Sequence, residues 1–122
     1  MGRTMTLGDV QKLLGAEVLS GEHLLETEVK TCFACDLISE MLLYTSPNTL
    51  LITSLTNLHV LHTAQVMDAV GVVFVGGKKP DASVIMNSVM SNVPLLTTTH
   101  LIFECCGLLY AKGMKGDKKR QN

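Results

Sequence analysis

The chain has 122 residues, of which 47% are hydrophobic, 17% charged and 4% aromatic, and its formal net charge at pH 7 is −1. This length and apolar content suit one domain with an aliphatic core, whereas the balanced charge and the scarcity of aromatic side chains argue against nucleic-acid binding. No apolar run approaches the roughly 20 residues that span a bilayer and no apolar signal region is present, so we expect a cytoplasmic protein that does not contact a membrane.

The N-terminal third is predicted to hold two helices and two strands. Residues 6–9 (TLGD) resemble a capping box, which predicts a short helix directly after them. Short strands are predicted at Ala16–Leu19 and Glu28–Phe33, on either side of a polar turn. A second helix is predicted over residues 36–44, where Asp36 is suited to cap its first turn.

From residue 50 onward, strands are predicted to alternate with helices. The predicted strands are Leu50–Thr53, Val72–Val75 and Pro94–Thr97, and the predicted helices are Asn57–Val70, which Gly71 would end, Asp81–Asn92 and Thr99–Lys112. Strictly alternating strands and helices, with fully apolar strands, favour an α/β fold: a single three-layer domain with a mostly parallel sheet flanked by helices. We expect this domain to span residues 1–113 and to be followed by a disordered basic tail at 114–122.

Each of these three strands is followed by a small or polar loop. Because the carboxyl ends of parallel strands meet at one edge of the sheet, these loops predict a ligand-binding edge. Helix N-termini and a lysine there favour a small anion, and adjacent glycines let the backbone approach it. The candidate residues are Ser54, Thr56, Asn57, Gly76, Gly77, Lys78, Thr98, Thr99 and His100. Ordinary turn and capping chemistry is the alternative, because neither a P-loop nor a dinucleotide fingerprint occurs.

Cysteine and histidine side chains are candidates for catalytic or metal-binding groups. Cys32 and Cys35 form a C-x-x-C between a predicted strand and a helix, the setting of a redox pair, but the adjacent Asp36 opposes thiolate formation. Metal binding would need further ligands, so small buried thiols are the favoured interpretation. His59 and His62 share a helix face and are expected to be exposed. We therefore predict no catalytic residue, metal or cofactor.

Four segments resemble DRTGG-domain proteins. They are residues 36–42 (DLISEML), 51–57 (LITSLTN), 72–80 (VVFVGGKKP) and 103–110 (FECCGLLY). The D-R-T-G-G string itself is absent, and residues 53–57 (TSLTN) stand where many relatives carry T-G-G-D-R. The resemblance implies a small α/β module similar to the N-terminal domain of HPr kinase and to the module inside CBS-domain pyrophosphatases, where it looks regulatory or dimerising. Stand-alone versions are associated with iron-only hydrogenase operons in anaerobes.

Three functional hypotheses follow. The first is a non-catalytic regulatory or assembly module that homodimerises or binds a protein partner, for which Met86 and Met90 would supply exposed apolar surface unless they pack in the core. The second is a sensor that binds a nucleotide or phosphorylated metabolite at the loop edge. The third is a thiol redox or metal protein that uses Cys32 and Cys35.

Overall fold

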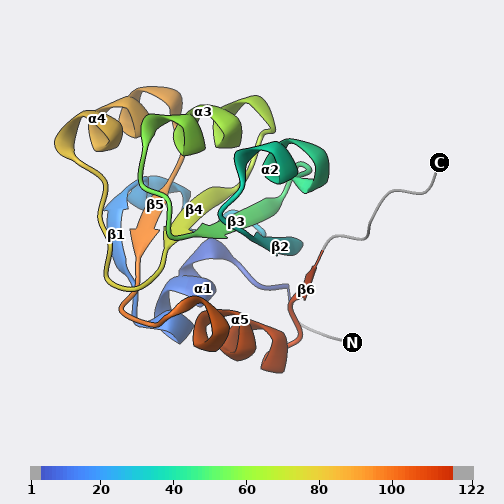
Figure 1. The fold of residues 1–122 in the computed structure, drawn as a ribbon. Coiled ribbons are helices and arrows are strands. Elements are labelled where there is room, and N and C mark those ends of the chain that lie inside the picture. The colour runs from blue at the N-terminus through green and yellow to red at the C-terminus, as the bar shows by residue number, and fades with distance from the viewer. Residues whose placement is uncertain (1–3, 117–122) are drawn as a thin grey trace.

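The computed structural model describes residues 4–116, which form a central sheet between two layers of helices (Figure 1). The strands are β1 (Glu17–Ser20), β2 (Thr31–Ala34), β3 (Thr49–Thr53), β4 (Gly71–Phe74), β5 (Leu95–Thr97) and β6 (Lys115–Gly116). The helices are α1 (Leu7–Leu14), the short 3-10 helix η1 (Glu22–Leu24), α2 (Ile38–Tyr44), α3 (Leu58–Val66), α4 (Ala82–Ser91) and α5 (Ile102–Ala111).

The sheet has the strand order β1-β5-β4-β3-β2-β6 and is parallel except for β1, which runs antiparallel to β5. Figure 1 shows α2, α3 and α4 above the sheet and α1 and α5 below it; these are called the upper and lower layers. This arrangement confirms the predicted three-layer α/β domain. Among residues 4–116, no helix has the length and apolar character needed to cross a membrane.

Two apolar clusters hold the layers to the sheet. In β3, Leu50 and Ile52 pack with the lower layer, whereas Leu51 between them packs with the upper layer. Successive strand residues point to opposite faces, so the middle of a strand covered on both sides is apolar without alternation. All residues of β3 and β4 are buried accordingly.

The helix starts follow local capping chemistry closely. Thr6 accepts a hydrogen bond from the Asp9 backbone N–H, and the Asp9 carboxylate accepts one from the Thr6 N–H, which completes the predicted capping box of α1. The side chain of Asn57 caps α3, and that of Asp81 caps α4. These helices therefore begin one residue later than predicted, because both predicted first residues are caps.

The predicted end of α3 is wrong. The helix ends at Val66 and its chain turns at Asp68, which adopts a φ of 59°, so Gly71 is left to begin β4. A Cβ atom on Gly71 would lie 2.9 Å from the carbonyl oxygen of Pro94. Glycine is needed here because the backbones of neighbouring segments approach closely, and it does not serve as a helix stop.

Both edges of the sheet depart from the sequence prediction. The two early strands do not pair with each other; β1 lies beside β5 and β2 beside β3. At the other edge, Met114 is buried and Lys115–Gly116 pair with β2 as β6, so the ordered domain extends past Gly113. The remainder of the predicted tail, 117–122, lies outside the described residues.

Candidate functional site

The loops that follow β3, β4 and β5 emerge at one edge of the sheet, as the sequence predicts (Figure 1). The loop after β4 leads up to α4, and the loop after β5 leads down to α5. Strands whose connections diverge in this way mark a topological switch point, where open α/β sheets usually have a ligand-binding crevice. The space between these two loops is therefore the expected position of a ligand.

In this protein the two loops are joined by backbone hydrogen bonds. The N–H of Gly76 donates to the carbonyl of His100 and that of Gly77 to the carbonyl of Thr98, both over 2.8 Å. Gly76 and Gly77 have φ values of 70° and 71°, a left-handed conformation that glycine adopts readily. A Cβ atom on Gly76 would lie 3.5 Å from the Leu101 side chain. The backbone N–H groups of the two glycines that were expected to approach a ligand thus bond to carbonyls of the neighbouring loop.

The predicted residues of the loop after β5 have separate positions. Thr98 is 2% exposed, and its hydroxyl donates to the carbonyl of Leu14 at the end of α1 over 2.9 Å. Thr99 is exposed, and the half-buried His100 has its Nδ1 3.8 Å from the Glu104 carboxylate. The prediction that a helix starts at Thr99 is wrong: α5 begins at Ile102, because the preceding residues bond the loop after β4.

The loop after β3 is tied to the loop after β2 by a carboxylate. Asp36 accepts hydrogen bonds from the Thr53 hydroxyl (2.7 Å), the Ser54 N–H (2.8 Å) and the Ser54 hydroxyl (2.6 Å). The prediction that Asp36 caps α2 is therefore wrong; Leu37 stands at that position and provides no side-chain cap. Sequence reasoning missed this clamp, although an Asp directly after a strand at the same edge was a usable signal.

Charge at this edge is mixed. The hydrogen bonds from Ser54, supported by those from Thr53 and by the nearby Lys78 ammonium, lower the pKa of Asp36 below its usual value. A carboxylate that stays ionised repels anions, while the exposed Lys78 attracts them. Of the other predicted residues, Asn57 caps α3 and Thr56 is half-buried.

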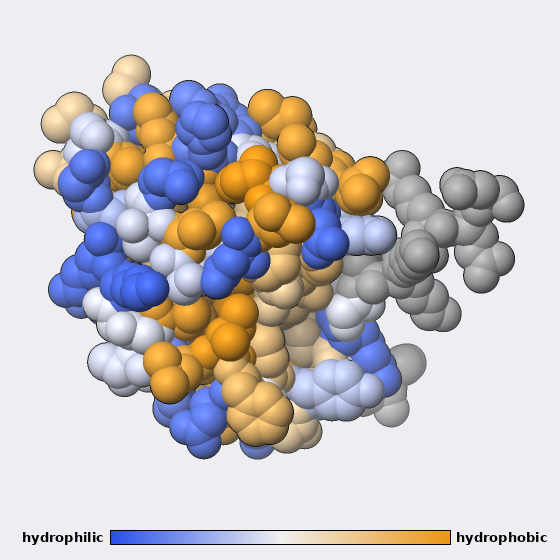
Figure 2. Space-filling view, in the orientation of Figure 1, coloured by the Kyte–Doolittle hydropathy of each residue, from blue (hydrophilic) through white to orange (hydrophobic). Residues whose placement is uncertain are grey.

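Apolar side chains are also exposed at this edge. Leu37 after β2 and Leu101 after β5 are largely solvent-accessible, as is Phe103 in the first turn of α5. Figure 2 shows hydrophobic side chains running down the middle of the view, from the upper layer to α5, with hydrophilic side chains to their left. The edge is therefore a surface of mixed polarity, with a lysine, an ionised carboxylate and exposed apolar side chains.

The C-x-x-C cysteines lie on opposite faces of the sheet. Cys32 packs with the cluster of the lower layer, whereas Cys35, three residues on, packs with the cluster of the upper layer. Burial raises the pKa of Cys32 to about 12, which disfavours the reactive thiolate. Within residues 4–116, no group of three Cys, His, Asp or Glu side chains is arranged to hold a metal. The two thiols therefore lie on different sides of the sheet, which does not favour the redox interpretation.

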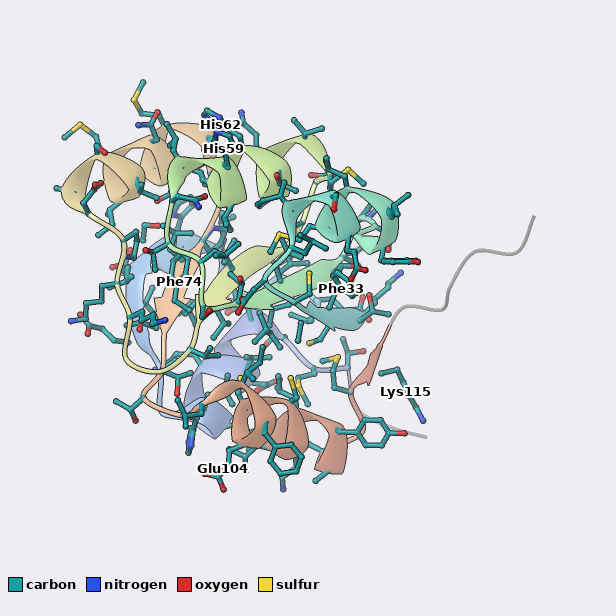
Figure 3. The ribbon with its side chains drawn as sticks, viewed as in Figure 1. Phe33, His59, His62, Phe74, Glu104 and Lys115 are labelled. Atoms are coloured by element: carbon teal, nitrogen blue, oxygen red, sulfur yellow. The ribbon has the colours of Figure 1, made fainter. Side chains whose placement is uncertain are left out.

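The outer side of the upper layer is a second surface of interest. From α4 it exposes Met86, Val89 and Met90, whose side chains are 66%, 60% and 79% exposed. Figure 3 shows His59 and His62 on the outer side of the neighbouring α3, and both are exposed as expected. Val84 and Ser88 occupy the buried side of α4.

These features define a small α/β domain with an open, mostly parallel sheet, in which backbone hydrogen bonds join the two loops at the switch point. The DRTGG domain family model matches residues 9–110, and the chain belongs to this family. No curated protein matches the chain.

A solved structure of similar fold is the CBS and DRTGG domains of the regulatory region of Clostridium perfringens pyrophosphatase, complexed with its activator, diadenosine tetraphosphate. The TM-score is 0.71 at 15% sequence identity, over 88% of this chain. The match spans only 47% of that chain, so the likeness concerns the fold of one part of the relative.

Proposed function

We propose that this chain is a non-catalytic regulatory module that forms a homodimer through the outer surface of α3 and α4. This surface, the α3–α4 face, consists of His59, His62, Gln65, Val66, Met86, Asn87, Val89 and Met90, all of them exposed. The observation that carries the proposal is its composition. Neither α3 nor α4 contains an Asp, Glu, Lys or Arg residue, although charged residues make up 17% of the chain.

An exposed helix surface without charge has the composition of an interface core. Charged residues are depleted at the centres of protein interfaces, whereas Met is enriched there. Met86, Val89 and Met90 are spaced i, i+3 and i+4, so they form one apolar stripe along α4. Met90 also lines a shallow hollow of about 190 Å³ between the two helices, together with His62 and Gln65 of α3. The stripe and the hollow are thus parts of one continuous surface.

A second copy of the chain suits this surface. A two-fold interface brings the same patch of both subunits together, so any charged side chain near its centre meets its own copy. The α3–α4 face avoids this repulsion because its polar members are His, Gln and Asn. A regulatory role is supported by the family and by the fold similarity to the regulatory region of a pyrophosphatase.

Sedimentation equilibrium tests the dimer. We expect the wild-type chain to be dimeric at micromolar concentration and Met90→Lys to be monomeric, because the substitution places a charge on the apolar stripe. Phe103→Lys is the matched control, since Phe103 is 85% exposed but lies on α5 in the lower layer. A monomeric wild type would overturn the proposal, and loss of the dimer in Phe103→Lys alone would place the interface on the other side.

A second candidate function is nucleotide sensing at the edge where the strands end. It is favoured by the exposed Lys78 and Thr99 at the switch point and by the dinucleotide activator of the similar structure. Diadenosine tetraphosphate at about 100 times its Kd would stabilise the fold by about 2.7 kcal/mol. We expect thermal unfolding to show this shift in the wild type and in Lys112→Glu, whose lysine lies at the far end of the sheet, but not in Lys78→Glu. The absence of any shift at millimolar ligand would remove this candidate.

A further inference from the structure

A half-open hollow lies between β2 and the C-terminal half of α5, away from both surfaces discussed so far. Its volume is about 220 Å³, and we call it the β2–α5 hollow. Its walls are formed mainly by Cys32, Ala34, Ile52, Cys106, Leu109 and Met114. The thiols and the thioether among these side chains behave as small apolar groups when buried. The interior is thus suited to an aliphatic chain.

The ammonium group of Lys115 lies at the β2–α5 hollow. Lys115 of β6 and Tyr110 of α5 complete its lining, and the Lys115 ammonium lies 6.0 Å from the centre of the Tyr110 ring. Figure 3 shows Lys115 at the C-terminal end of α5, far along the helix from Glu104. No Asp or Glu side chain is among the described residues that line the hollow. The ammonium therefore has no carboxylate partner in the lining.

We propose that the β2–α5 hollow binds a short-chain aliphatic carboxylate, with the alkyl chain against the apolar walls and the carboxylate at Lys115. The volume has room for roughly seven non-hydrogen atoms at about 30 Å³ each, which is close to the size of pentanoate or hexanoate. An aliphatic chain with a single negative end complements both the apolar interior and the Lys115 ammonium beside it. This site is independent of the α3–α4 face and of the loop edge.

The burial of the alkyl chain and the ion pair with Lys115 contribute to the affinity by different amounts, so they can be measured separately. Each methylene that the walls remove from water contributes about 0.8 kcal/mol, which is about fourfold in Kd. Affinity for the probes should therefore rise about fourfold per carbon from propanoate to hexanoate and then level off when the hollow is full. The exposed ion pair with Lys115 contributes less, about two- to fivefold.

The cysteines provide the readout. Cys106 lines the hollow, whereas Cys35 packs against the upper layer on the opposite face of the sheet. We expect hexanoate to slow the alkylation of Cys106 by N-ethylmaleimide and to leave that of Cys35 unchanged, with mass spectrometry assigning the sites. Equal alkylation rates at Cys106 with and without saturating hexanoate would overturn the proposal. Equal slowing at Cys35 would indicate a global effect on stability and would also overturn it.

Two variants and hexanol, as a probe without the carboxylate, test where the carboxylate and the alkyl chain bind. Lys115→Gln should weaken hexanoate binding about two- to fivefold without changing the binding of hexanol, because only the carboxylate forms an ion pair with the ammonium. Ala34→Leu should fill the hollow and weaken both probes; since this variant can disturb folding, the chain-length series in the wild type serves as the second measure. Equal losses of hexanoate and hexanol in Lys115→Gln, or a flat chain-length series, would contradict the proposed pose.

Discussion

Thr98 and Thr99 are adjacent threonines whose replacement by valine should have very different effects. Both were predicted to bind a ligand, but the Thr98 hydroxyl is buried and donates to the Leu14 carbonyl over 2.9 Å, whereas Thr99 is exposed. Carbonyl groups at the end of a helix have no partner within the helix, so this hydroxyl satisfies a group that α1 cannot. The same Oγ1 also accepts from the N–H of His100 over 3.4 Å.

The size of the effect follows from that geometry. Thr98→Val keeps the shape of the side chain but leaves a buried acceptor without a partner, which costs about 1–3 kcal/mol. Thr99→Val makes the same chemical change at an exposed site, where substitutions usually stay within about 0.5 kcal/mol. With an m value of about 2 kcal/mol/M, the urea midpoint of Thr98→Val should fall by roughly 0.5–1.5 M relative to the wild type.

Equilibrium urea unfolding followed by far-UV circular dichroism measures both variants under one condition. Comparable midpoints for Thr98→Val and Thr99→Val would refute the structural role assigned to Thr98. An unchanged m value is the control that the comparison requires, since a changed slope would indicate an altered unfolded state or a departure from two-state unfolding.

Two further predictions concern the carboxylate clamp and the close approach of two backbones. Asp36 has a lowered pKa in the folded state, so its contribution to stability is present above its unfolded pKa of about 3.9 and is lost as pH falls through the folded value. The stability gap between the wild type and Asp36→Asn in urea unfolding should therefore narrow from pH 6 to pH 3, and a constant gap would contradict the clamp to Ser54. Gly71→Ala should cost about 1–3 kcal/mol because its Cβ would meet the Pro94 carbonyl oxygen at 2.9 Å. Gly107→Ala, in the exposed and open part of α5, should instead stabilise by about 1 kcal/mol; thermal unfolding that shows the same sign for both would refute this assignment.

Several parts of the fold could be predicted from the sequence because they depend on short-range physics. The capping box at Thr6 and Asp9 closes within four residues, and the cap of Asn57 likewise bonds only three residues on. The consecutive apolar residues of β3 and β4 indicate a sheet covered on both faces, because a sheet with one solvated face favours alternation of apolar and polar residues. The position of the loop edge follows from the same parallel order.

The hydrogen-bond partners of the residues at that edge depended on contacts between residues distant in the chain. Whether the N–H groups of Gly76 and Gly77 face a ligand or a neighbouring loop is decided by the position of the loop after β5, about 20 residues away. Asp36 could have capped α2, but the strand order brings Ser54 within hydrogen-bond distance, and three bonds to one carboxylate outweigh a single local cap.

The sequence by itself therefore determined the α/β class, the parallel core strands and the family of this protein, since each rests on local patterns of side chains. Only the tertiary structure decided that the loops after β4 and β5 bond to each other, that Cys32 and Cys35 lie on opposite faces, and that Met86 and Met90 point to solvent. The reason is physical: a local pattern restricts which conformations a segment favours, whereas hydrogen-bond partners and solvent exposure are set by the segments that pack beside it.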